Sequence, residues 1–269
     1  MSACRFKCVR QPAVAGLFYP ADADELRRLV HFSLAAAMRF DEPNGITKAL
    51  VLPHAGLIYS GPVAGTGYKL LEKDRDAVRR IILLGPSHRV AFDGLALSEA
   101  AAFTTPLGEI PIDEEGTAAA LLVPGVCRME AAHAREHSLE MQLPFLQTVL
   151  GHFTLVPMVV GETNETQLNA VLEKLWGGPE TRIIVSSDLS HFHNYRTARQ
   201  LDQKTAAQVE ALESVTPEQA CGANPLNGLL RAARNHKLTA RTLDLRNSGD
   251  TTGNRSRVVG YGAFAFLED

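Results

Sequence analysis

Four short apolar runs recur along the chain, and each leads into a turn rich in Gly, Pro or Ser. The runs are continuous rather than alternating, which is typical of strands buried on both faces of a sheet. They cover residues 49–52, 81–84, 153–160 and 182–185. Two further strands are predicted near the C-terminus, over 238–245 and 258–266, around a polar, glycine-containing loop.

Between these runs the apolar residues recur at helical spacing. Asp22, with Glu25 three residues later, predicts a helix start, and Leu26, Leu29, Val30 and Leu34 then share one face. Other helices are predicted over 62–73, 164–176, 196–213 and 228–235. This alternation predicts an α/β fold, in which helices flank a mostly parallel or mixed central sheet. We expect a single domain over residues 1–269, with residues 1–9 forming a flexible N-terminus or a strand.

The composition narrows the classes of function. The chain has 269 residues, of which 45% are hydrophobic and 21% charged, as in ordinary globular proteins. A chain of this length buries roughly three quarters of its unfolded surface, so a metal is not needed to hold the fold together. The net charge is −3 and no basic stripe is present, which argues against nucleic acid as a partner. No run reaches the roughly 20 apolar residues of a membrane span, and no secretory leader is evident, so we expect a cytoplasmic protein.

The four cysteines are Cys4, Cys8, Cys127 and Cys221. In a reducing compartment such residues are more often free thiols than disulfides. Cys4 and Cys8 have a spacing that a metal clip could use, but they lie close to the N-terminus, and we expect them to be free thiols.

Three of the apolar runs each deliver a histidine just beyond the strand. The first run leads into Pro-His54-Ala-Gly, the second into Gly-Pro-Ser-His88, and the fourth into Ser-Ser-Asp-Leu-Ser-His191. Ligands of open α/β sheets bind beyond the carboxyl ends of the strands. Imidazoles that meet at this edge can bind a divalent ion through neutral ring nitrogens, so the pattern predicts a shared metal site.

A third ligand is needed, and the candidates are Cys221, Asp188 and Glu140. Cys221 opens a Cys-Gly-Ala-Asn-Pro turn before the helix predicted at 228, a placement that would lower the pKa of its thiol and favour the metal-binding thiolate. The alternative for Cys221 is a buried structural thiol.

Residues 136–144 (EHSLEMQLP) hold a further cluster. His137 and Glu140 are three residues apart and would share a helix face, as metal ligands, as a general acid/base pair or as a capping pair. His-Glu-x-x-His is absent, so the chain is not a metalloprotease of that class. Gly-x-Ser-x-Gly is absent too, which weakens a serine hydrolase built from Ser87 and Asp188.

Taken together, these motifs resemble the Memo family, and they match it in order from about residue 10 to residue 266. Each motif alone is weak, but the series is highly specific. The matching segments are 11–20 (QPAVAGLFYP), 53–56 (PHAG), 59–61 (YSG), 85–88 (GPSH), 136–140 (EHSLE), 186–188 (SSD) with His191, 221–222 (CG) with Pro225, 248–250 (SGD) and 259–261 (VGY).

The resemblance implies a fold like that of the class III extradiol dioxygenases, which use non-haem Fe(II). It implies that His54, His88 and Cys221 bind the metal. We expect Fe(II), with Cu or Zn as alternatives. His191 is implied to line the same pocket, and its expected partners in acid/base catalysis are Asp188, His137 and Glu140.

One departure from the dioxygenases bears on the reaction. Those enzymes hold iron with two histidines and a carboxylate, whereas the third position here is Cys221. A thiolate is softer and is itself oxidisable, so the fold analogy does not carry ring cleavage with it.

The function expected from the resemblance is a metal-dependent redox enzyme, a dioxygenase-like oxidoreductase acting on an unknown small molecule. One alternative is a non-enzymatic metal-handling or peptide-binding module, because eukaryotic relatives are described as phosphotyrosine adaptors. Arg89 is the single phosphate-binding candidate in the sequence. Another alternative is an accessory role in a radical-SAM modification system. Bacterial and archaeal members are called AmmeMemoRadiSam system protein B, with radical-SAM and Ammecr-type partners.

Overall fold

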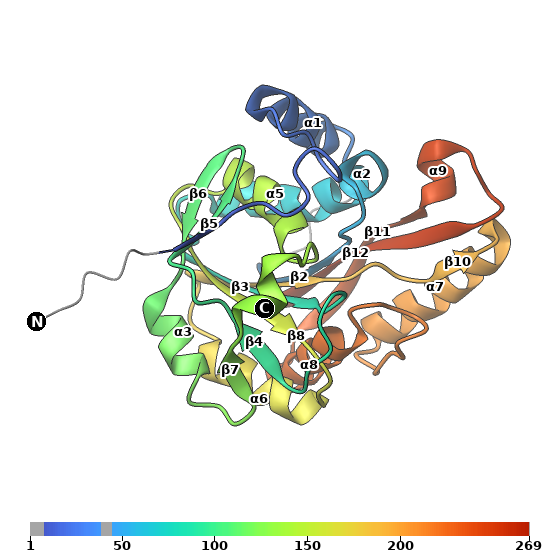
Figure 1. Ribbon diagram of the computed structural model, residues 1–269. Helices are drawn as coiled ribbons and strands as arrows, with labels where there is room; N and C mark the ends of the chain where they lie inside the picture. Colours follow the sequence, from blue (N-terminus) through green and yellow to red (C-terminus); the bar gives the residue numbers. More distant parts are fainter. Residues whose placement is uncertain (1–7, 39–44, 269) are drawn as a thin grey trace, which may run out of the picture.

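A mixed β-sheet runs through the molecule (Figure 1), and its long strands contain the four predicted apolar runs and the two strands predicted near the C-terminus. The computed structural model describes residues 8–38 and 45–268. Its long strands are β2 (Ile46–Leu52), β3 (Arg80–Pro86), β8 (Thr154–Val160), β9 (Thr181–Ser186), β11 (Thr239–Asn247) and β12 (Val258–Glu268). The prediction of an α/β fold with a mixed central sheet is therefore confirmed.

The strand order places the ends of four parallel strands on one edge. Across the sheet the order is β10 (His191–His193), β12, β2, β9, β3, β8, β4 (Leu95–Leu97) and β7 (Val126–Arg128), with β11 also paired to β12. Neighbours among β2, β9, β3 and β8 are parallel, whereas β12 and β4 join this group antiparallel. A smaller sheet consists of β1 (Val9–Arg10), β5 (Ala102–Thr105) and β6 (Gly108–Pro111).

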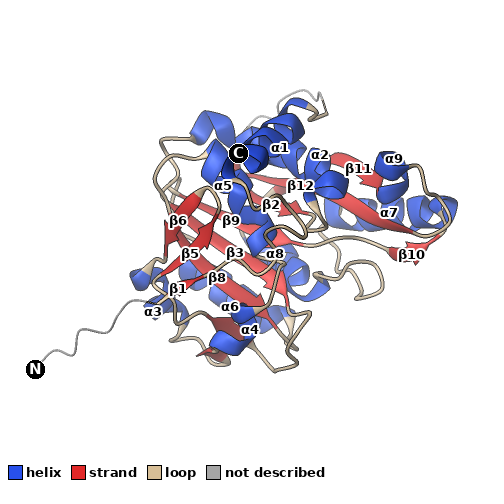
Figure 2. Cartoon of the chain, turned by 45° about the horizontal axis from the view of Figure 1, so that its top comes forward, coloured by secondary structure: helices blue, strands red, loops and turns tan. Residues whose placement is uncertain are grey.

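Both faces of the central sheet are buried, which explains the continuous apolar runs. Leu50 and Leu52 of β2 face one core, and Ala49 and Val51 face the other. The first core is covered by α1 (Ala23–Ala35), α2 (Leu57–Tyr68) and α5 (Leu143–Val149). The second is covered by α6 (Glu165–Leu175), α7 (Tyr195–Glu210) and α8 (Ala223–Asn235). Figure 2 shows the red strands passing between these two sets of helices.

Two of the predicted helix starts are confirmed by their caps. The Asp22 carboxylate accepts hydrogen bonds from the backbone N–H groups of Asp24 and Glu25 at the start of α1. Asn164 caps α6 by accepting the N–H of Gln167. Each cap satisfies N–H groups that have no partner inside the helix.

Three other predicted helices have different bounds. Helix α2 begins at Leu57, five residues before the predicted start at Pro62, and continues as the 3₁₀-helix η1 (Lys69–Asp74). Helix α8 begins at Ala223, so Pro225 lies in its first turn, where a missing N–H has no cost. Helix α7 ends at Glu210, three residues before the predicted end.

The short elements were not predicted, because they are too short for a periodic pattern. They are α3 (Glu114–Ala120), α4 (Glu130–Ala134), η2 (Glu140–Gln142), α5, α9 (Ser248–Thr252), β10 and strands β4 to β7.

Strand β2 begins at Ile46, before the predicted start at residue 49. The prediction missed these residues because Lys48 is polar and interrupts the apolar run, although it is buried in the strand. The Lys48 side chain is almost inaccessible, and its ammonium donates to the carbonyl oxygens of Trp176 (2.6 Å) and Gly178 (3.1 Å), which follow the last residue of α6. A buried ammonium with carbonyl partners is tolerated in a strand that would otherwise be apolar.

The described part of the N-terminal region begins at Cys8. Residues 1–7, and therefore Cys4, lie outside the described residues, and Val9 begins β1. Cys8 and Cys127 are exposed free thiols. Within residues 8–38 and 45–268, no helix is long and apolar enough to cross a membrane.

Candidate metal centre

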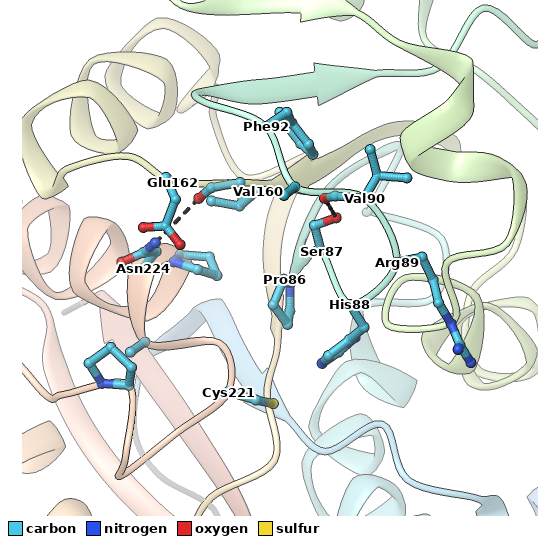
Figure 3. Close-up of a pocket in the computed structure, with 15 residues that line it drawn as sticks. Pro86, Ser87, His88, Arg89, Val90, Phe92, Val160, Glu162, Cys221 and Asn224 are labelled. Atoms are coloured by element: carbon cyan, nitrogen blue, oxygen red, sulfur yellow. Dashed lines mark hydrogen bonds between the residues drawn. The ribbon is translucent and has the colours of Figure 1, made fainter.

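Two of the three strand-end histidines meet a cysteine at the edge of the sheet. His54 follows β2 and His88 follows β3, while Cys221 lies directly before Gly222, the N-cap of α8. One ligand atom from each of the three side chains lies within 4.8 Å of the other two. Figure 3 shows His88 and Cys221 pointing into the same space from opposite sides. The tertiary structure thus brings together the residues predicted to bind metal.

His54 is buried and held at three points. Its backbone N–H donates to Asp188 Oδ1 (2.8 Å), its ring Nδ1 lies 2.9 Å from Ser186 Oγ, and its Nε2 lies 3.4 Å from Cys221 Sγ. Burial lowers the pKa of His54 to about 4, against a smaller opposing effect of Asp188. The imidazole is therefore neutral at physiological pH, which is the form that binds metal.

His88 is held by Glu136, a residue that the sequence reasoning did not select. Its ring Nδ1 lies 2.9 Å from Glu136 Oε1, and its backbone N–H donates to Oε2 (2.6 Å). Burial would raise the pKa of Glu136, but contacts with His137 and His88 outweigh it and hold this pKa well below its usual value. An ionised carboxylate accepts the Nδ1–H of His88, so the ring presents Nε2 to the site.

The environment of Cys221 differs from the expectation. Its side chain is half-buried next to Asp188, and desolvation, followed by the negative charge of Asp188, raises the pKa of the thiol to about 12. The predicted lowering of the pKa by the helix start is therefore wrong for the metal-free protein. Apart from His54 Nε2, its polar contacts are with a carbonyl and a hydroxyl oxygen: the Asp188 carbonyl lies 3.7 Å and Ser187 Oγ 4.0 Å from Sγ. A metal ion would supply the positive charge that the thiolate needs.

The donor set fits a transition metal. Two neutral imidazoles and a thiol are the ligands that iron, copper or zinc accept. Bonds of about 2.1 Å to nitrogen and 2.3 Å to sulfur in a tetrahedral site would separate the two ligand atoms by about 3.6 Å. The observed separation of 3.4 Å between His54 Nε2 and Cys221 Sγ agrees with this geometry.

A glycine next to Cys221 lets this loop approach the end of β9. A Cβ at Gly222 would lie 2.7 Å from the Cβ of Ser187 and 2.8 Å from the Ser186 carbonyl oxygen. The Gly222 N–H donates to Ser187 Oγ (2.9 Å). Only glycine fits here, so the Cys-Gly pair positions the thiol.

His137 lies beside His54 and His88. Its ring centroid is 4.8 Å from that of His88 and 5.5 Å from that of His54, and Phe18 packs edge-on against it at 5.0 Å. His137 Nδ1 lies 3.2 Å from Glu136 Oε1. His88, Glu136 and His137 also satisfy the geometry of a metal-binding group.

Glu140 points away from these histidines. Its two carboxylate oxygens accept hydrogen bonds from Arg10 Nη1 (2.7 Å), Tyr19 Oη (2.6 Å) and the backbone N–H groups of Ala13 and Val14. His137 precedes η2 in an irregular turn, so the two residues do not share a helix face as predicted. The catalytic role expected of Glu140 stays a prediction, and its contacts tie the N-terminal segment to the core.

Asp188 and His191 both line the main cavity, together with the candidate ligands His54 and His88. Asp188 is buried, and the hydrogen bond from His54 N–H engages its Oδ1. The ring Nδ1 of His191 lies 2.7 Å from the Leu189 carbonyl oxygen. Because a carbonyl only accepts, this nitrogen carries a hydrogen, and Nε2 of the neutral ring is unprotonated.

The main cavity has a volume of about 770 Å³ and is large enough for a small organic molecule. Its lining residues are Phe18, His54, Ala55, Gly56, Tyr59, His88, Arg89, His137, Asp188, His191, Ser248, Asn254, Arg257, Val259 and Tyr261. A second cavity of about 450 Å³, shown in Figure 3, reaches His88 and Cys221 between the loops after β3 and β8 and the start of α8.

Several residues of the site were missed by sequence reasoning. Glu136 directly precedes His137 in the family-matching segment 136–140, so its position was a usable signal. Ser186 and Gln142, which contact the His54 side of the site, are ordinary polar residues with no distinguishing pattern. Arg257 and Tyr261 reach the cavity from the C-terminal strand region. Tyr261 lies in the matching segment 259–261, whereas no sequence pattern distinguishes Arg257.

The fold and the site together define an α/β protein whose parallel strands deliver two histidines to a cysteine in a candidate metal centre. A family model described as Memo-like protein matches residues 10–265. The chain is 34% identical to a MEMO1 family protein of Ignicoccus hospitalis, covering 96% of this chain and 98% of that protein. It is 33% identical to one of Methanopyrus kandleri (96% and 98%) and 34% identical to one of Aquifex aeolicus (96% and 99%).

The chain therefore belongs to the Memo-like family, and the resemblance drawn from its motifs is confirmed.

Proposed function

We propose that this chain is a metal-dependent redox enzyme that acts on a small molecule, with Fe(II) bound by His54, His88 and Cys221. One observation supports the proposal most directly. The three ligand atoms converge within 4.8 Å, and the two histidines also line a cavity of about 770 Å³. Such an ion keeps positions open for a substrate, as catalytic metal sites do.

The chain's own residues would bind, orient and exchange protons with the substrate. Bound iron would supply one-electron redox chemistry and a positive charge next to the substrate. His191 lines the cavity, and its Nδ1 is held by the Leu189 carbonyl, so its Nε2 can accept or return a proton. Phe18 and Tyr59 form an apolar wall against which a ring or chain could pack.

Asp188 and His137 would assist His191 by positioning the ligands around the metal, Asp188 next to His54 and His137 next to His88. Asp188 fixes the His54 backbone and adds negative charge near the thiol. His137 stands beside His88 and shares its contact with Glu136, which links the two rings through one carboxylate. The reaction need not be ring cleavage, because Cys221 replaces the carboxylate of the extradiol dioxygenases.

The first experiment measures metal content and Fe(II) affinity under anaerobic conditions. We expect tight, stoichiometric binding by the natural protein and a loss of binding in His54→Ala and in Cys221→Ser. Cys127→Ser is the matched control. Cys127 is exposed on β7, the last strand of the sheet, and two strands separate β7 from β3, which precedes His88. Binding that survives both site substitutions would contradict the metal centre.

The second experiment tests catalysis. The Fe(II) form should consume O₂ faster in the presence of a suitable phenolic or related compound, and His191→Ala should slow this consumption while leaving Fe(II) bound. If no compound in a broad panel raises O₂ consumption, the redox enzyme proposal fails, although the metal centre stands.

A binding module is the second candidate function, favoured by two arginines. Arg89 and Arg257 both line the main cavity, whereas the sequence pointed to Arg89 alone. Guanidinium groups are the usual partners of phosphate and carboxylate in peptide recognition. Binding of a phosphotyrosine peptide that survives His54→Ala and His88→Ala, and is lost in Arg257→Ala, would favour this reading over the enzyme.

A further inference from the structure

A chain of buried side chains leads from the core to the ring of His54. It consists of Tyr68 in α2, Gln142 in η2 and Ser186 at the end of β9, none of which is accessible to solvent. Tyr68 Oη lies 2.9 Å from Gln142 Oε1, and Gln142 Nε2 lies 2.8 Å from Ser186 Oγ. Ser186 Oγ in turn lies 2.9 Å from His54 Nδ1.

The backbone carbonyl of Pro53 fixes the orientation of the Gln142 amide. This oxygen lies 3.0 Å from Gln142 Nε2, and a carbonyl can only accept a hydrogen bond. The amide nitrogen must therefore face Pro53, and its second hydrogen is donated to Ser186 Oγ. The amide oxygen is then the group that accepts the Tyr68 hydroxyl.

The carbonyl of Ser138 fixes the Ser186 hydroxyl in the same way. It lies 2.6 Å from Ser186 Oγ, so it takes the single hydrogen of that hydroxyl. The two lone pairs of Ser186 Oγ remain as acceptors, and one of them takes the Gln142 N–H. The other lone pair faces His54 Nδ1, so this nitrogen must carry a hydrogen.

We infer that Gln142 and Ser186 are positioning residues that hold neutral His54 in its Nδ1–H tautomer, with the Nε2 lone pair aimed at the metal position before any metal binds. Nε2 faces Cys221 Sγ, the other ligand, at 3.4 Å. The role of this tautomer in metal binding rests on the proposed function. The tautomer itself follows from hydrogen bonds within the chain.

Ser186 is the acceptor on which this arrangement depends. Among residues 8–38 and 45–268, Ser186 Oγ is the only hydrogen-bond partner of His54 Nδ1. His88 is held differently, because its Nδ1 meets the ionised Glu136. Without Ser186, the His54 ring would bury an Nδ1–H with no acceptor, and the hydrogen would move to Nε2, where it blocks metal binding.

Nitrogen NMR of the metal-free natural protein, labelled with ¹⁵N-histidine, tests the tautomer directly. The His54 resonances, assigned by their loss in His54→Gln, should show a protonated Nδ1 and an unprotonated Nε2. The opposite pattern in the natural protein would overturn the inference, and this measurement needs no variant that might misfold.

Anaerobic Fe(II) affinity in variants then tests the purpose of the network. Ser186→Ala should shift His54 toward the Nε2–H tautomer and weaken Fe(II) binding by about 10- to 100-fold. Gln142→Met should cost less, because Ser186 keeps its bond to Ser138 and still accepts from His54. Ser186→Thr keeps the hydroxyl and should restore binding relative to Ser186→Ala.

Ser33→Ala is the matched control. Ser33 is a buried serine whose hydroxyl donates only to the Leu29 carbonyl of its own helix, so its loss should change neither the tautomer nor the affinity. A folded Ser186→Ala protein with natural Fe(II) affinity would overturn the inference and leave the proposed function standing. A natural protein that shows the tautomer but takes up no Fe(II) would overturn the proposed function, and with it the purpose of the network.

Discussion

At the residue scale, the carboxylate of Glu136 holds His88, one of the two histidines of the candidate metal centre. Glu136 is fully buried, and its Oε1 accepts from the backbone N–H groups of His137 and Ser138 as well as contacting His88 Nδ1. A buried charge survives only when it is surrounded by donors, and Glu136 has them on both oxygens. The same contacts orient the ring of His88.

Glu136→Gln should therefore weaken Fe(II) binding by about 10- to 100-fold while keeping the size of the side chain. The amide NH₂ must face either the His88 N–H or the donors at Oε1, and a donor facing a donor disturbs the position of His88. Fe(II) affinity under anaerobic conditions measures the effect. Glu130→Gln is the control, because Glu130 also accepts a backbone N–H, from Glu99, but is not in the ligand group. Equal affinities in the two variants would rule out this role for Glu136.

At the element scale, the contact between α1 and α2 decides where α2 lies, and α2 starts three residues after His54. Two glycines of α2 face Ser33 of α1. A Cβ at Gly65 would lie 2.4 Å from the Ser33 carbonyl oxygen, whereas a Cβ at Gly61 would lie 2.6 Å from Ser33 Oγ. The first obstacle is backbone and the second is the end of a side chain.

Gly65→Ala should destabilise the protein by about 1–3 kcal/mol, because the clash with backbone outweighs the roughly 1 kcal/mol that alanine gains over glycine inside a helix. Gly61→Ala should cost less, since the Ser33 hydroxyl can rotate away at the loss of its bond to Leu29. Urea unfolding of both variants measures the difference. A Gly65→Ala protein more stable than the natural one would contradict this close packing of α1 on α2.

At the scale of the whole molecule, a buried aspartate makes the unfolding free energy depend on pH. Asp202 of α7 is almost inaccessible, and its Oδ1 accepts the N–H of Ser190 next to His191. Burial raises the pKa of Asp202 from 3.8 to about 6, against smaller opposing effects of Ser190 and His193. The folded protein thus binds this proton more tightly than the unfolded chain does.

The free energy of unfolding should fall as the pH rises from about 4 to about 6, by up to about 3 kcal/mol from this group, and then level off. The sign follows because the folded state holds more protons than the unfolded state in that window. Asp202→Asn keeps an oxygen for the Ser190 N–H and removes the titration, so its stability should lack this fall. Urea unfolding of both proteins across pH 4–8 provides the comparison, and parallel curves would contradict the prediction.

The sequence by itself determined the long strands of the central sheet and the histidines that follow them. The continuous apolar runs predicted β2, β3, β8 and β9 because both faces of these strands are buried, and a strand buried on both faces cannot alternate. His54, His88 and Cys221 could be selected because histidines after parallel strands must share one edge, and because the motifs resembled the Memo family. Caps such as Asp22 fixed helix starts through local hydrogen bonds.

Only the tertiary structure decided how these residues act on one another. It showed that Glu136 and Ser186 hold the two histidines, that Glu140 turns toward Arg10, and that burial raises the pKa of the Cys221 thiol. These features join residues far apart in the chain, and hydrogen bonding and burial depend on neighbours in space. Sequence patterns report a residue's local conformation and burial, whereas a pKa or a tautomer is set by the groups that the fold places around it.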